Sequence, residues 1–168
     1  TAYDLLLVEK EGTLVCLNAH LANDLFAVWL KKGKLLPFNN YRAFYREKAI
    51  GQSRIDFFLE FPQYESLVEI KSVNLVDQGL ALFPDAPTAR GSKHLEELIS
   101  FKDNGHQAAV VFIIMRDDAQ KLSPHYKMDP LFGSTIRKAV ETGVQVIAYK
   151  CKVTEQGMKF NGEVPIIL

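Results

Sequence analysis

An unbroken run of eight apolar residues, 108–115, restricts the possible folds of this chain more than any other part of its sequence. A strand built from such a run has no polar side to turn toward water, so it needs cover on both faces. Strands of this kind are typical of parallel sheets, in which crossover helices pack on the two faces. The run therefore predicts a central strand in an α/β protein.

The segment before this run predicts a helix. Leu95, Leu98 and Ile99 recur at helical spacing and form its apolar side. Either Asp85 or Thr88 is a suitable N-terminal cap. This helix can cover one face of the central strand.

The segments after the run continue the alternation of helices and strands. Asp129 and Pro130 predict the start of a second helix, and Gly143 predicts its end. Residues 144–153 then predict a further strand. The order helix, strand, helix, strand is the pattern of parallel crossovers.

The first part of the chain predicts a hairpin followed by one amphipathic helix. Residues 3–8 and 13–17 predict the two strands of the hairpin. Apolar residues at helical spacing predict a helix over 21–29, with Asn18 as the possible N-cap and Gly33 as the stop.

Three later segments carry weaker signals. Residues 74–88 show no clean period, and residues 123–128 predict a loop. The chain closes with a turn at Gly157 and a short apolar tail.

The composition excludes several kinds of protein. Twenty Lys and Arg residues balance twenty Asp and Glu residues, so the chain lacks the basic surplus needed to bind nucleic acid by phosphate neutralisation alone. Cys16 and Cys151 stand far apart, which argues against a zinc knuckle or a disulfide framework. No run approaches the roughly 20 apolar residues that cross a bilayer, and no segment resembles a secretory signal. We therefore expect a cytoplasmic protein without membrane contact.

Residues 51–73 predict a β-hairpin, because two alternating runs, 53–61 and 67–73, flank a short linker. Residues 41–50 predict a strand that ends at the Gly51 turn. The hairpin thereby extends to a three-stranded meander. Within the first run, alternation predicts Ile55, Phe57 and Leu59 on one side and Asp56 and Phe58 on the other.

This hairpin brings acids and a lysine together. If it closes at residues 61–65, Asp56 lies across from Glu69, and Lys71 shares the face of Glu69. Like charges opposite each other destabilise a sheet unless something relieves them. A divalent cation held by Asp56 and Glu69 would do so. An internal ion pair of Lys71 with either acid would serve equally well, so spacing alone leaves both interpretations open.

Two further sets of charged residues are candidates for a site. Glu47 precedes the Gly51 turn and is either a third carboxylate of the cluster or an exposed glutamate at a strand end. Arg90, Lys93 and His94 share one face at the start of a helix, where cations oppose the helix dipole unless an anion is present. They indicate either a phosphate-binding surface or a solvated face.

Other catalytic patterns are missing from the sequence. It contains no glycine-rich phosphate loop followed by Lys and Ser or Thr, no GxSxG elbow and no HExxH helix. Those alternative chemistries are therefore poorly supported.

Four segments resemble the sugar fermentation stimulation protein A (SfsA) family, within the PD-(D/E)xK nuclease-like superfamily. They are SRIDFFLE at 53–60, VEIKSVNLV at 68–76, FPDAPTARGSKHLEEL at 83–98 and GVQVIAYK at 143–150. An acid on one strand, followed by Glu-x-Lys on the next and backed by a helix and a strand, is the arrangement of that superfamily.

The resemblance implies an α/β fold with a restriction-endonuclease-like core. Its mixed central sheet combines an antiparallel meander with parallel crossovers and is flanked by helices. The family also has an N-terminal OB-like barrel thought to bind nucleic acid. Residues 1–17 would be a remnant of, or connection to, that mostly absent barrel, and residues 18–168 would be the nuclease-like domain.

The resemblance also implies a site. Asp56, Glu69 and the backbone carbonyl of Ile70 would hold Mg²⁺ or Mn²⁺, Lys71 would be the catalytic lysine and Glu47 an additional acid. The residues that would contact nucleic-acid phosphates are Arg54, Arg90, Lys93 and His94.

Two functions follow from the resemblance. The first is a metal-dependent DNA nuclease that hydrolyses phosphodiester bonds. The alternative is a non-catalytic DNA-binding regulator of sugar catabolism genes of the maltose type. Either would contact DNA mainly through the missing N-terminal barrel. A metabolic enzyme acting on a small phosphorylated sugar is a third possibility that rests only on the family's name.

Overall fold

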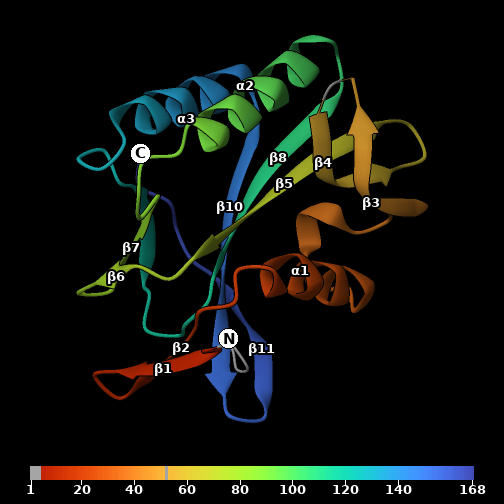
Figure 1. The fold of residues 1–168 in the computed structure, drawn as a ribbon. Helices are drawn as coiled ribbons and strands as arrows, with labels where there is room; N and C mark the ends of the chain where they lie inside the picture. The colour runs from red at the N-terminus through yellow and green to blue at the C-terminus, as the bar shows by residue number, and fades with distance from the viewer. Residues whose placement is uncertain (1–4, 52) are drawn as a thin grey trace.

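A six-stranded mixed sheet forms the centre of the computed structural model, which describes residues 5–51 and 53–168 (Figure 1). The strand order is β11-β10-β8-β5-β4-β3. The strands are β3 (Ala43–Ile50), β4 (Ser53–Glu60), β5 (Glu65–Val73), β8 (Gln107–Ile114), β10 (Gln145–Thr154) and β11 (Gly157–Glu163). Strands β3, β4 and β5 form an antiparallel meander, β5, β8 and β10 run parallel, and β11 returns antiparallel. The expected α/β class with its mixed sheet is confirmed.

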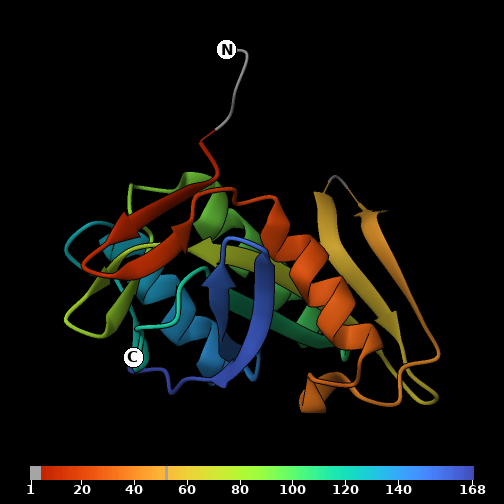
Figure 2. The same ribbon diagram turned by 90° about the horizontal axis from the view of Figure 1, so that it is seen from below.

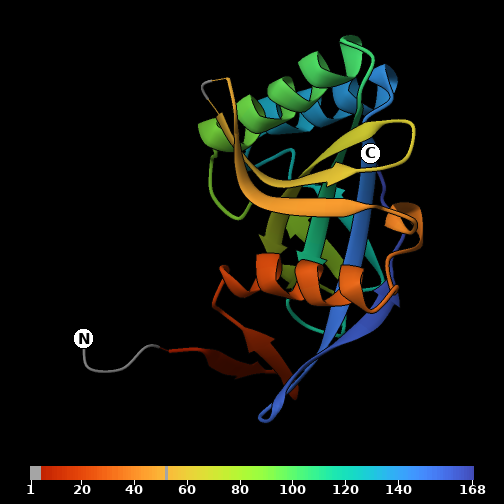
Figure 3. The same cartoon turned by 90° about the vertical axis from the view of Figure 1, so that its right-hand side faces the viewer.

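Strand β8 lies inside this sheet and is buried along residues 108–114. The flanking helices are α1 (Leu21–Lys31), α2 (Ala89–Asp103) and α3 (Pro130–Thr142). Ala109, Val111 and Ile113 belong to the apolar cluster that includes α1, whereas Val110 and Phe112 belong to the cluster under α2 and α3. Figures 2 and 3 show α1 on one side of the sheet and α2 and α3 on the other. The apolar run is thus confirmed as a strand covered on both faces.

Most of the predicted helix ends are confirmed, and one is wrong. The hydroxyl of Thr88, and not Asp85, caps α2 by accepting a hydrogen bond from the N–H of Gly91 at 2.9 Å. Asn18 does not cap α1, because its side chain accepts from the N–H of His20 before the helix begins. Because its side-chain oxygen is engaged in this local turn, it does not accept from the first N–H groups of the helix.

Several short strands were not predicted from the sequence. A second sheet of three strands has the order β6-β7-β9, with β6 (Val76–Asp77), β7 (Leu80–Phe83) and β9 (Lys121–Pro124). It occupies part of the segment without a clean period and part of the predicted loop. The expected turn near Gly157 is present, because Thr154 pairs with Gly157 across residues 155 and 156, but strand β11 occupies much of the expected apolar tail. Pairing between distant segments, such as β7 with β9, depends on tertiary contacts and not on local pattern.

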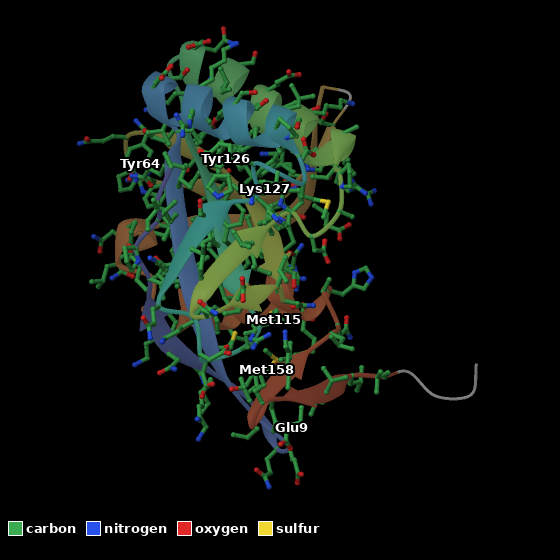
Figure 4. All side chains as sticks on the ribbon, turned by 90° about the vertical axis from the view of Figure 1, so that its left-hand side faces the viewer. Glu9, Tyr64, Met115, Tyr126, Lys127 and Met158 are labelled. Atoms are coloured by element: carbon green, nitrogen blue, oxygen red, sulfur yellow. The ribbon has the colours of Figure 1, made fainter. Side chains whose placement is uncertain are left out.

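The N-terminal hairpin forms a separate two-stranded sheet of β1 (Leu7–Lys10) and β2 (Thr13–Cys16). It joins the core where the N–H of Cys16 donates to the carbonyl of Met115 at 3.0 Å, and Figure 4 shows Met115 near this hairpin. The first residues of the predicted strand, Tyr3 and Asp4, lie outside the described residues. The assignment of residues 1–17 to an N-terminal barrel remains a prediction.

Two other features complete the fold. A short 3-10 helix, η1 (Leu36–Phe38), follows α1. Within the described residues, no helix has the length and apolar character that a membrane span requires.

Asp129 links the starts of two helices. One oxygen accepts from the N–H of Phe132 at 2.9 Å and caps α3, and the other accepts from the N–H of Thr88 at 2.8 Å. The N–H groups of Thr88 and then Phe132 lower the pKa of this buried carboxyl. Because α2 carries His94, this bond also helps to place the candidate site.

We expect Asp129→Ala to lower the free energy of unfolding by about 2 kcal/mol, because it removes a cap and leaves a backbone donor unpaired. The folded-state pKa lies below the unfolded value, so this contribution is complete above about pH 4 and disappears as pH falls through the folded-state pKa. Urea denaturation at neutral and acidic pH measures both effects. Ser134→Ala, an exposed site on the same helix, is the control; an equal loss there would contradict the capping role.

Candidate functional site

The pairing of β4 with β5 ends beside the acidic residues. The two strands pair as far as Phe57 opposite Val68. Beyond that pair, Oδ2 of Asp56 accepts a hydrogen bond from the N–H of Ile70 at 2.8 Å. The register thus places Asp56 across from Glu69, as the hairpin pattern predicts.

The carboxylate of Asp56 accepts two hydrogen bonds, but its surroundings disfavour the ionised form. Its other oxygen, Oδ1, accepts from the side-chain amide of Asn23 in α1 at 2.9 Å. Burial and, next, the charge of Glu69 raise the pKa of Asp56, although the two hydrogen bonds and the charge of Lys71 act against this rise. Additional positive charge at this place would therefore stabilise the ionised form.

The carboxylate of Glu69 is almost completely buried. Its Oε1 accepts from Lys71 Nζ at 2.9 Å and is hydrogen-bonded to Nδ1 of His94. Burial opposes ionisation, but the hydrogen bond from His94 and the charge of Lys71 outweigh it and lower the pKa of Glu69. The second oxygen, Oε2, is buried and has no hydrogen-bond partner among residues 5–51 and 53–168. Such an atom is costly unless a ligand or ion satisfies it.

His94 connects this ion pair to the start of α2. Arg90 Nε donates to Nε2 of His94 at 3.3 Å, so we assign the ring proton to Nδ1, which then donates to Glu69. Lys71 Nζ also lies 3.3 Å from Nδ1. Arg90, His94, Lys71 and Glu69 therefore form one continuous polar chain from the surface to the buried carboxylate.

The other predicted site residues lie outside this chain. Lys93 is exposed and forms a surface pair with Glu97 at 3.7 Å. Arg54 and Glu47 are both exposed and pair with each other at 3.1 Å. Within residues 5–51 and 53–168, no three His, Cys, Asp or Glu side chains form a ready metal-binding group.

Glu47 and Ile55 show where the strand pattern fails. Glu47 lies opposite Asp56 in the β3-β4 register but has a φ of 50°. Ile55 packs in the cluster under α2 and α3, whereas Phe57 and Leu59 pack toward α1, so the prediction that all three share one face is wrong. A left-handed residue in the paired strand increases local twist, and the alternation breaks at Asp56.

Asn23 is the functional residue that the sequence analysis missed, although a signal for it exists. It lies three, four and seven residues before Phe26, Ala27 and Leu30, which are all buried. An amide on the apolar stripe of a helix needs a polar partner inside the protein. The sequence could not identify that partner as Asp56, which is 33 residues away.

A pocket of about 570 Å³ lies away from this site, at the β4-β5 turn. Its lining includes Arg42, Tyr64 and His106. Tyr64, labelled in Figure 4, is 44% exposed. None of Asp56, Glu69 and Lys71 lines this pocket.

Comparison with known proteins relates this chain to one family. A sequence model described as the "Sugar fermentation stimulation protein RE domain" matches residues 20–157. A sugar fermentation stimulation protein homolog of Moorella thermoacetica is 50% identical over 91% of this chain and 66% of its own length. A homolog of Chloroflexus aurantiacus is 42% identical over 99% of this chain and 64% of its own length. The chain thus spans about two thirds of the length of these curated relatives.

A solved structure shares the same fold. It is described as the structure of Pyrococcus furiosus SfsA in complex with Ca²⁺. It is 30% identical in sequence to this chain and superposes with a TM-score of 0.92 over 98% of this chain and 71% of its own. The resemblance found from four sequence segments is confirmed.

We expect Lys71→Met to lower the free energy of unfolding by about 1 to 3 kcal/mol, because it removes a partner of a buried carboxylate. Adding Glu69→Gln should restore part of the loss, since the carboxylate charge is then gone. Urea denaturation at neutral pH is the measurement. Lys93→Met, which breaks an exposed pair, is the matched control. Equal effects of the two lysine substitutions would contradict the buried network.

Proposed function

This chain belongs to the sugar fermentation stimulation protein family, and we propose that it hydrolyses phosphodiester bonds of DNA with a divalent cation held by Asp56 and Glu69. The observation that carries the proposal is a half-buried carboxylate, Asp56, close enough to the buried carboxylate of Glu69 for the Glu69 charge to raise its pKa. Among the described residues, Oε2 of Glu69 has no hydrogen-bond partner. The structure of the Pyrococcus furiosus relative in complex with Ca²⁺ supports it further.

The donor groups fit a hard cation such as Mg²⁺ or Mn²⁺. Carboxylate and carbonyl oxygens are the ligands that these ions prefer. Asp56 and Glu69 would provide the carboxylates and the backbone of Ile70 the carbonyl oxygen. When bound, the cation would polarise the phosphate and lower the pKa of a water molecule.

The remaining residues have separate tasks in this proposal. Lys71 lies beside Glu69 and orients the attacking water or stabilises negative charge on the phosphate. Arg90, in the first turn of α2, faces an incoming phosphate together with the N-terminal end of the helix. His94 holds Glu69 in place and links it to Arg90.

DNA binding extends beyond this site in our proposal. The net charge of the chain is zero, so a few local cations would have to contact the backbone. Arg54 and Lys93 are exposed and are available for such contacts. An N-terminal barrel would supply most of the affinity.

A non-catalytic DNA-binding regulator is the second candidate. One observation favours it: Lys71 is paired with Glu69, as expected of a purely structural ion pair. Such a protein would bind DNA equally well with and without a divalent cation.

Cation binding tests the proposed site. We expect calorimetric titration with Mn²⁺ to show binding that is at least tenfold weaker in Asp56→Ala. Substituting even a residue that only holds a metal ligand commonly lowers metal affinity by about tenfold or more, so loss of a ligand should cost at least as much. Glu96→Ala, which removes an exposed acid from α2, should bind like the unchanged protein. Absence of Mn²⁺ binding in the unchanged protein would overturn the proposal.

Cleavage tests the role of Lys71. In single-turnover assays on plasmid and single-stranded DNA with Mg²⁺ or Mn²⁺, Lys71→Ala should slow cleavage by roughly 100-fold or more, because charge stabilisation in the transition state is lost. Its Mn²⁺ affinity should not fall, because the lost ammonium group repels the cation and competes for Glu69. Lys102→Ala on α2 is the control. If no DNA is cleaved and the DNA affinity is the same with and without the divalent cation, the non-catalytic regulator is the better description.

A further inference from the structure

We propose that Asn23 is a positioning residue of the candidate cation site, because its side-chain amide fixes the Asp56 carboxylate in the orientation that holds a divalent cation. This inference rests on the proposed function and adds helix α1 to a site otherwise built from β4, β5 and α2. Asn23 acts through Asp56 and needs no contact with the cation.

The hydrogen bonds around Asp56 restrict its side chain from two directions. Asn23 Nδ2 donates to Oδ1 at 2.9 Å, and the N–H of Ile70 donates to Oδ2 at 2.8 Å. Each carboxylate oxygen can accept more than one bond, so both keep lone pairs for a cation. With only the bond from Ile70, the carboxylate could rotate about its last torsion angle.

The core holds Asn23 itself in place. One turn further along α1, Phe26 is fully buried and its ring centroid lies 4.7 Å from that of Phe57, the residue after Asp56. The helix and the strand therefore dock against each other next to the amide. A donor fixed by such packing positions its acceptor without losing much entropy when the cation binds.

An amide suits this position better than an acid or an apolar group. Glu69 already repels Asp56, so another carboxylate in contact would increase the repulsion. An apolar side chain would leave Oδ1 without its donor. Asn23 donates a hydrogen bond and adds no charge. Residues that hold metal ligands in this way typically change metal affinity by about 10 to 100-fold when they are substituted.

The test is calorimetric titration of the whole chain with Mn²⁺ and with Ca²⁺. We expect Asn23→Ala and Asn23→Leu to weaken binding of both ions about tenfold or more. Asn23→Leu keeps the branching and the number of non-hydrogen side-chain atoms, and so helps to separate the hydrogen bond from packing. The control is Asp24→Ala, which removes the exposed ion pair of the neighbouring residue with Arg46, 2.7 Å in length, and should stay within about twofold of the unchanged protein.

Melting temperatures without added cation distinguish positioning from general support of the fold. A positioning role requires that affinity falls while Asn23→Leu remains folded under the titration conditions. If the unchanged protein binds either ion and both Asn23 variants bind it within about twofold of that affinity, the positioning role is overturned and the proposed function stands. If the unchanged protein binds neither ion, the proposed function itself fails.

Discussion

Two neighbouring carboxylates, the half-buried Asp56 and the buried Glu69, impose the condition that the surrounding structure has to satisfy. A buried charge is costly unless it has partners, and two like charges at close range add to that cost. Asp56 obtains donors from the β5 backbone and from α1, and Glu69 obtains them from Lys71 and from His94 on α2. Even so, one oxygen of Glu69 has no hydrogen-bond partner in the part of the chain that the structure describes, and the pKa of Asp56 is raised. This incomplete neutralisation is what a cation-binding site requires.

The two covered faces of the sheet make this arrangement possible. Helix α1 packs against one face and α2 against the other, since the alternate residues of β8 supply an apolar surface to each (Figure 3). One helix can then deliver Asn23 and the other His94 to neighbouring strands. Their positions are set by packing over long distances, so the polar groups meet without relying on flexible loops.

The parts of the fold that could be predicted are those with a strong local signal. The buried strand β8, the caps at Thr88 and Asp129 and the meander around residues 43–73 follow from apolar runs, capping residues and alternation. Glu69 and Lys71 were placed together correctly because two residues on one strand share a face. The prediction for the face of Ile55 was wrong, because a regular alternation pattern cannot reveal a local irregularity in the pairing of two strands.

What remained beyond prediction depends on contacts between distant segments. From residue order alone follow the α/β class and the approach of Asp56 to Glu69, because period, capping and hairpin register act over short distances. The family followed separately, from the resemblance of four sequence segments. The pairing of β7 with β9, the return of β11 and the bond from Asn23 to Asp56 arise only when the chain packs. Tertiary packing also decided two side-chain partners. Glu47 pairs with Arg54 on the surface, and His94 contacts the buried carboxylate of Glu69.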